Sequence, residues 1–207
     1  MEYRAVGSRC AVDIGSLELP LSDKEVLSVL VGKGFTQVNV NLVSVARSCV
    51  GTSAYVRGAR PSAAPAVVDC SSFTKWLYGC RGIWLPRRSI QQRALGESVE
   101  YADILAEDLV FVSGFIDYYH NDPADGVGHV GIATGDGTVV HAANRKVGVV
   151  ETPLSEFVEC KFRGIRRYVP SGCSVLTLET PVSREVETSG DVRWIVMQSL
   201  PQGVTTA

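Results

Sequence analysis

The sequence predicts an α+β fold in which a helical N-terminal half packs on an antiparallel β-sheet. One observation is a run of apolar residues at helical spacing, namely Phe73, Leu77 and Cys80. A second is a pair of apolar segments, 128–134 and 138–143, that flank Gly135-Asp136-Gly137 in the pattern of a β-hairpin. The third is composition: 45% hydrophobic and 20% charged residues in a chain of 207 fit a packed core.

Two helices are expected before residue 50. Ser22 is followed three residues later by Glu25, which forms a capping box, and this helix ends at Gly32 or Gly34. The second helix is expected over residues 40–49. Residues 1–20 are weakly patterned, so we expect an irregular arm or one short strand there.

The helix that follows Asp69 is the centre of the chemical argument. Asp69 is a suitable N-cap, which places Cys70 in the first turn. The positive end of the helix dipole there favours thiolate over thiol. Pro86 blocks continuation of this helix, and Ser89 is expected to begin a short one.

The second half of the chain predicts the sheet. Apolar runs predict strands over residues 106–112, 128–134, 138–143, 148–151 and 162–169, with a short helix over 154–158. Residues 113–127 are rich in aromatic and acidic side chains, and we expect a loop beside the site. In the C-terminal tail, residues 192–197 predict one strand, and the tail could add an edge strand, cover a face or mediate dimerisation.

A thiolate nucleophile needs a base and a group that orients the base, and the chain contains three histidines: His120, His129 and His141. If the hairpin loop is 135–137, His129 and His141 share a face as diagonal neighbours, about 7–8 Å apart between backbones. A two-residue loop would place them on opposite faces. The chemistry therefore requires an odd-numbered loop.

Several segments together resemble the NlpC/P60 cysteine peptidases. They occur in that family's order within residues 40–168 and comprise Tyr55-Val56-Arg57-Gly58, Asp69-Cys70-Ser71, Leu85-Pro86-Arg87, Asp108-Leu109-Val110-Phe111, Gly128-His129-Val130-Gly131-Ile132 and Val140-His141-Ala142-Ala143. The resemblance implies a papain-like NlpC/P60 fold that hydrolyses amide bonds in peptidoglycan stem peptides or muropeptides. The bond implied is that between D-γ-glutamate and a diamino acid.

On this basis we expect Cys70 to be the nucleophile, His129 the general base and His141 the residue that orients it. The resemblance suggests Asp69 and Ser71 as substrate contacts, with Asp69 receiving a substrate ammonium group, and Tyr55 is a further candidate. Ser72 replaces the family's commoner glycine, and we expect it to narrow the pocket. The pair Arg87 and Arg88 is expected to be solvated. His120, which lacks a motif, is expected at the surface.

The expected organisation is an N-terminal arm and helix over residues 1–39, a catalytic domain over 40–170 and a C-terminal extension over 171–207 packed on the same domain. The net charge of −2 does not indicate the basic surface that nucleic-acid binding requires. No apolar run is long enough to predict a membrane span. No cofactor or metal is expected, because the six cysteines show no CxxC and no zinc-finger spacing.

Three alternatives remain open at this point. The same cysteine and histidines fit an acyltransferase or deamidase that acts on a protein or lipid, with the chain as an effector. The chain could also be a binding module that kept the fold, or a zinc-binding protein that uses Cys70, His129 and His141. The first residues show no Sec-type signal peptide, so the expected location is the cytoplasm, a non-Sec export route, or a natural start further upstream.

Overall fold

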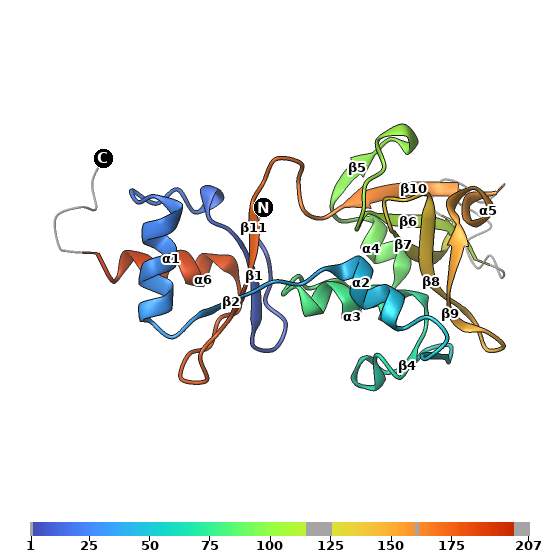
Figure 1. Ribbon diagram of the computed structural model, residues 1–207, viewed down its shortest axis with the longest axis horizontal. Coiled ribbons are helices and arrows are strands. Elements are labelled where there is room, and N and C mark those ends of the chain that lie inside the picture. Colours follow the sequence, from blue (N-terminus) through green and yellow to red (C-terminus); the bar gives the residue numbers. More distant parts are fainter. Residues whose placement is uncertain (1, 115–125, 160–161, 201–207) are drawn as a thin grey trace. The chain divides into compact units, whose positions relative to one another are not determined.

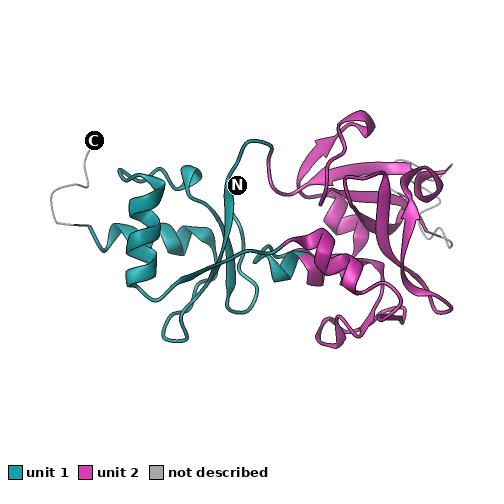
Figure 2. Ribbon diagram, viewed as in Figure 1, with its two compact units in different colours: residues 1–40, 78–84, 171–207 teal, residues 41–77, 85–170 magenta. Residues whose placement is uncertain are grey.

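A computed structural model describes residues 2–114, 126–159 and 162–200 of the chain. The chain divides into two compact units (Figure 2). Unit 1 consists of residues 1–40, 78–84 and 171–207, and unit 2 of residues 41–77 and 85–170. Each unit therefore gathers segments that are far apart in the sequence.

Unit 2 is built on an antiparallel sheet of six strands (Figure 1). Their order across the sheet is β5-β10-β6-β7-β8-β9. The strands are β5 (Glu97–Val99), β6 (Leu109–Ser113), β7 (Val127–Ala133), β8 (Thr138–Asn144), β9 (Gly148–Pro153) and β10 (Phe162–Arg167).

Helices precede and flank this sheet, so the α+β prediction is confirmed. The described residues of unit 2 form the helices α2 (Leu42–Ser48), α3 (Cys70–Cys80, whose last three residues belong to unit 1), α4 (Ser89–Arg93) and α5 (Leu154–Val158). α2 contacts β7 and β8, α4 contacts β7 and β10, and α5 contacts β6, β8 and β9. A short parallel pair, β3 (Ala54–Tyr55) and β4 (Val67–Val68), leads into α3. Single 3₁₀ turns lie at Pro61–Ala63 and Tyr101–Asp103.

One apolar cluster joins the sheet of unit 2 to α5. Phe157 from α5 packs with buried strand residues, which are Val110, Val112, Ala133, Val139 and Ile165. Burial of such side chains stabilises the fold by about 1.5–3 kcal/mol each. The same contact holds α5 against the face of the sheet that carries the histidines of β7 and β8, as the ring distances below show.

The register of the β7–β8 hairpin is the one that the chemistry requires. Ile132 pairs with Val140 and Ala133 with Val139, so residues 135–137 form the odd-numbered loop that was predicted. Gly131 makes this register possible. A Cβ at position 131 would lie 2.4 Å from Val139 Cγ1 and 3.0 Å from His141 Cβ, so a larger residue would collide with Val139 and crowd His141.

Unit 1 is a small α+β assembly of chain ends. Its antiparallel sheet has the order β1-β11-β2, with β1 at Arg9–Asp13, β11 at Val175–Glu179 and β2 at Thr36–Val38. A 3₁₀ turn follows β1 at Gly15–Leu17, and the helices are α1 (Asp23–Gly32) and α6 (Ser189–Met197). Both helices contribute to one apolar core with β1 and β11. The tail therefore supplies the central strand of this sheet.

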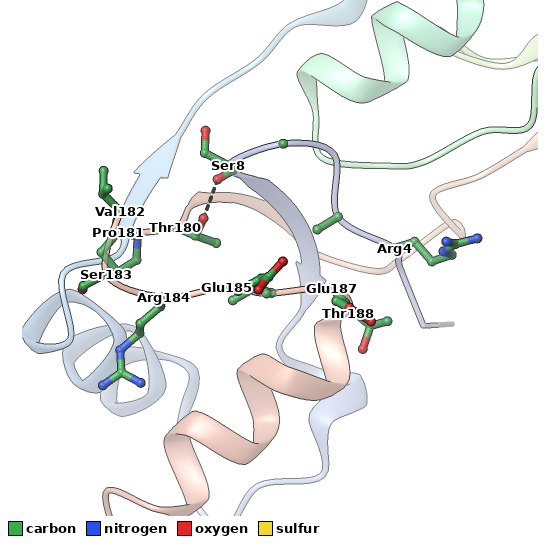
Figure 3. A pocket seen from close by; sticks show the side chains of 13 residues that line it. Arg4, Ser8, Thr180, Pro181, Val182, Ser183, Arg184, Glu185, Glu187 and Thr188 are labelled. Atoms are coloured by element: carbon green, nitrogen blue, oxygen red, sulfur yellow. Dashed lines mark hydrogen bonds between the residues drawn. The ribbon is translucent and has the colours of Figure 1, made fainter.

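A cavity of about 890 Å³ lies in unit 1 beside the segments 4–8 and 180–188 (Figure 3). Thr180 Oγ1 donates to the carbonyl of Ser8 at 3.1 Å and ties the two segments together. Arg4, in the segment 4–8, stacks over the ring of Trp84, 4.5 Å from the ring centroid. The lining carries both signs of charge, with Arg4 and Arg184 among the cations and Glu185 and Glu187 among the acids.

The prediction of a strand over residues 192–197 is wrong, because this segment is helix α6. Thr188 is its N-cap and accepts from the Gly190 amide at 3.1 Å, while Asp191 Oδ2 accepts from the Thr188 amide at 2.9 Å. Val192, Ile195 and Val196 are buried at helical spacing. The β-branched composition of the run favours a strand, whereas the capping box at 188–191 favours a helix.

Other elements follow the predictions closely. The capping box of Ser22 and Glu25 starts α1, α2 lies within the expected 40–49, and the helix over 154–158 is confirmed. Most of the expected loop over 113–127, including His120, lies outside the described residues, so its role stays a prediction. Among the helices described, none is long and apolar enough to cross a membrane.

Candidate active site

The helix that carries Cys70 begins with a reciprocal cap. Asp69 Oδ1 accepts from the Ser72 amide at 2.8 Å, and Ser72 Oγ accepts from the Asp69 amide at 2.8 Å. Cys70 is consequently the first residue of α3, as predicted. Ser72 is only 1% exposed, and its hydroxyl serves this cap. The expectation that Ser72 narrows the pocket is therefore wrong.

Arg87 clamps the capping carboxylate from the loop before α4. Its Nη1 donates to Asp69 Oδ1 at 3.0 Å and to Ser71 Oγ at 3.0 Å, and its Nη2 donates to Asp69 Oδ2 at 2.5 Å. The Ala59 carbonyl also accepts from Nη2, at 2.9 Å. Burial raises the pKa of Asp69, but Arg87 and the Ser72 amide outweigh it and hold that pKa below its usual value. The predicted solvated pair is thus wrong for Arg87.

The environment of Cys70 favours the neutral thiol. Burial, together with the nearby Asp69 carboxylate, raises the pKa of Cys70 to about 11. The backbone amides of Val130 and Ser71 act in the opposite direction, with a smaller effect. Desolvation and the Asp69 carboxylate thus oppose the thiolate that the helix end is predicted to favour. The hydrogen bond from the Val130 amide places the thiol beside β7.

The two histidines of the hairpin contact each other directly. His129 Nε2 lies 2.9 Å from His141 Nδ1, and the ring centroids are 5.0 Å apart in an edge-to-face arrangement. The second nitrogen of His141, Nε2, lies 3.0 Å from Thr152 Oγ1 on β9. Phe157 of α5 packs against both rings, with centroid distances of 5.6 Å to His129 and 4.7 Å to His141.

Burial makes His141 a neutral imidazole at physiological pH. Its side chain is largely enclosed, and this burial lowers the pKa of His141 to about 4. A neutral imidazole has one N–H and one lone pair on its two nitrogens. His141 can therefore accept from His129 while donating to Thr152, or the reverse. The contact through Nε2 of His129 makes Nδ1 the nitrogen that would take the proton of Cys70.

A cavity of about 880 Å³ in unit 2 brings the predicted site residues together. Among the residues that line it are all six candidates from the sequence, namely Tyr55, Asp69, Cys70, Ser71, His129 and His141. Arg87, Thr152 and Phe157 line it as well. The cavity combines a thiol, an imidazole pair and a clamped carboxylate, which is a set suited to nucleophilic attack on an acyl group.

Sequence reasoning missed three side chains that support this set. Gln92 of α4 is fully buried, donates to the carbonyls of Ser71 and Pro86 at 2.9 and 3.0 Å, and accepts from Thr74 Oγ1 at 2.9 Å. Thr152 and Phe157 complete the surroundings of the histidines. The sequence alone marks none of the three as part of the site. For Thr152, strand alternation predicts that it shares a face with His141, but only once the β8–β9 register is known from the structure.

The residues described in the three ranges above contain no group of three or more His, Cys, Asp and Glu side chains placed to hold a metal ion. The zinc hypothesis for Cys70, His129 and His141 therefore gains no support from this part of the chain.

Comparison with known proteins relates the chain to one family. The model of the NlpC/P60 family matches residues 51–167. A probable endopeptidase of Corynebacterium glutamicum is 40% identical over 116 residues, which cover 56% of this chain and 46% of the relative. A γ-D-glutamyl-L-lysine dipeptidyl-peptidase of Bacillus cereus is 33% identical over 104 residues, covering 49% of this chain and 29% of the relative. The chain thus spans less than half the length of these relatives.

Solved structures show the same fold. An NlpC/P60 family protein from Bacillus cereus superposes with a TM-score of 0.50 at 27% identity, covering 62% of this chain and 39% of that protein. NlpC2 from Trichomonas vaginalis superposes with a TM-score of 0.52 at 24% identity, covering 61% of this chain and 44% of that protein. The second likeness concerns the fold alone.

Proposed function

The chain belongs to the NlpC/P60 family, and we propose that it is a cysteine endopeptidase that cleaves peptidoglycan stem peptides. The bond that we propose is the amide between D-γ-glutamate and a diamino acid. We assign this activity to unit 2. The main support is that Cys70, His129 and His141 all line one cavity, with His129 Nε2 2.9 Å from His141 Nδ1.

The geometry supports a general-base mechanism in which the resting thiol is neutral. His129 takes the proton of Cys70 through Nδ1 as Sγ attacks the substrate carbonyl carbon. The imidazolium that results keeps its Nε2–H directed at His141, which stays neutral because of its low pKa. His141 therefore orients the base by accepting a hydrogen bond and takes no proton itself.

The remaining steps follow from the same residues. We assign stabilisation of the oxyanion of the tetrahedral intermediate to the first-turn amide of Cys70. Collapse of the intermediate breaks the C–N bond, and His129 returns its proton to the departing amine. Water then attacks the thioester and gives one proton to His129, which passes it to the Cys70 sulfur as the C–S bond breaks. The acyl group leaves as a carboxylic acid, which loses its proton to solvent.

The choice of substrate rests on the relatives and on the polar wall of the cavity. The Bacillus cereus relative is named for a γ-D-glutamyl bond, which is the bond proposed here. We assign substrate binding to Tyr55, Asp69 and Ser71, which line the cavity beside Cys70. Since Arg87 already neutralises much of the charge on Asp69, we expect Tyr55 and Ser71 to contribute more to binding than Asp69 does.

Mass spectrometry of defined stem peptides tests this proposal. The free tripeptide L-Ala-γ-D-Glu-meso-diaminopimelate and its muropeptide form are incubated with the wild type, Cys70→Ala and Cys173→Ala. The last variant is a matched control that removes an exposed thiol from unit 1. We expect cleavage after D-glutamate by the wild type and Cys173→Ala, and none by Cys70→Ala. Intact peptides after incubation with the wild type would refute the proposed bond.

A further inference from the structure

The hydrogen bond between His129 and His141 can run in either direction, because each ring nitrogen can donate or accept. We argue that the direction depends on the contact made by the other nitrogen of His141. That nitrogen, Nε2, lies 3.0 Å from the hydroxyl of Thr152, a residue of β9 that also lines the cavity. No other hydrogen-bond partner of Thr152 Oγ1 occurs among the described residues.

The register of the β8–β9 pair places Thr152 close to His141. His141 pairs with Val150 and Val139 pairs with Thr152 across the β8–β9 ladder. Side chains two residues apart on neighbouring strands lie on the same face as diagonal neighbours. Thr152 is therefore the polar side chain that β9 supplies to His141 on the face that carries the cavity.

The reaction needs one of the two neutral forms of His141. For His129 Nδ1 to take a proton, its own N–H must be on Nε2, and His141 Nδ1 must then accept. The single proton of His141 consequently lies on Nε2, where it requires an acceptor because the ring is buried. Thr152 Oγ1 is at the right distance to be that acceptor.

We propose that Thr152 is a positioning residue of the catalytic site, whose hydroxyl accepts from His141 Nε2–H and so keeps the lone pair of His141 Nδ1 directed at His129. This inference rests on the proposed function of His129 as the base. The depressed pKa of His141 agrees with it, since a neutral ring is required.

Loss of the hydroxyl has a definite consequence for the protons. Without Thr152 Oγ1, a proton on His141 Nε2 is buried without an acceptor, whereas a proton on Nδ1 donates to His129 Nε2. The Nδ1–H form is then favoured. His129 must in turn carry its proton on Nδ1, the nitrogen to which we assign the proton of Cys70, and it loses the lone pair that a base needs. The active form becomes a minor species.

The first variant for the test is Thr152→Val, which keeps the β-branched shape and removes the hydroxyl. An unmatched buried N–H costs about 1–3 kcal/mol, which corresponds to a fall of about 5-fold to 160-fold in kcat. We expect KM for the stem peptide to change little and Thr152→Ser to restore kcat. The matched control is Thr138→Val, which removes a hydroxyl that bonds Thr134 and Glu151 at the loop end of the same hairpin.

Nuclear magnetic resonance gives a readout that does not depend on activity. The chain has three histidines, so long-range ¹H–¹⁵N spectra assign the tautomer of each ring with few signals. We expect His141 to carry its proton on Nε2 in the wild type and in Thr152→Ser, and on Nδ1 in Thr152→Val. Thr152→Ala serves as a second variant without the hydroxyl, and it should show the same change.

Two results would overturn the inference. One is a His141 proton that remains on Nε2 in both variants without the hydroxyl. The other is a loss of kcat in Thr152→Val that Thr152→Ala does not share, because that pattern reports packing. An inactive wild type with the expected tautomers would instead refute the proposed function alone.

Discussion

Acidification below neutral pH is expected to destabilise unit 2 through His141. In the folded protein, burial of this side chain lowers its pKa from 6.5 to about 4. The unfolded chain exposes the ring and restores the ordinary value. Between these two pKa values, the unfolded state binds a proton at His141 that the folded state excludes.

The direction and size of the effect follow from this difference. Since the unfolded state binds more protons, the free energy of unfolding rises with pH. The contribution of His141 is complete above pH 6.5 and is lost as the pH falls to the folded-state pKa. At 1.36 kcal/mol for each pH unit between the two values, the loss amounts to about 3 kcal/mol.

Urea denaturation of the wild type and His141→Asn at several pH values between 7.5 and 4 measures this term. The amide of the variant can hydrogen-bond but does not titrate, so the difference between the two proteins isolates His141 from the carboxylates, which titrate in both. We expect the wild type to lose about 3 kcal/mol relative to the variant across this range. A difference independent of pH, or a His141 resonance that titrates near pH 6.5, would refute the reasoning.

Three further predictions concern neighbouring contacts. Gln92→Leu removes three buried hydrogen bonds and should lower the free energy of unfolding by about 3 kcal/mol; equal urea midpoints for Gln92→Leu and wild type would contradict this. Phe157→Ala should lower the free energy of unfolding by about 3–5 kcal/mol and, by exposing the ring, raise the pKa of His141, which a magnetic resonance titration would detect. An unchanged pKa would show that residues other than Phe157 bury His141. With its pKa near 11, Cys70 in the free enzyme should react with iodoacetamide faster at each step from pH 7 to pH 9, whereas a rate already constant at pH 7 would show a preformed thiolate.

The parts of the site that the sequence predicted are those set by local geometry. Strand alternation and one loop length determine that His129 and His141 share a face, and a cap places Cys70 at a helix start. These relations hold within a dozen residues. The structure confirms the register and the helix start.

The parts that the sequence could not predict depend on long-range contacts or on opposing effects. Arg87 reaches Asp69 across 18 residues, and Gln92 reaches Ser71 across 21, so no local pattern marks either side chain. The state of Cys70 required a balance between burial and the helix end, and only the folded environment gives the burial. Segment 192–197 was misread because its composition favours a strand and its preceding cap favours a helix.

The order of strands in unit 1 has a consequence for synthesis of the chain. β11 is the central strand, so β1 and β2 have no partner in this sheet until residues 175–179 have been made. Ribosomes deliver the N-terminus first, and all of unit 2 emerges in the interval. During that time β1, with Cys10, Ala11 and Val12 destined for full burial, presents an apolar edge to other chains. A ribosome that stalls before residue 175 would therefore release a chain in which unit 2 is nearly complete but the first strand is prone to aggregate.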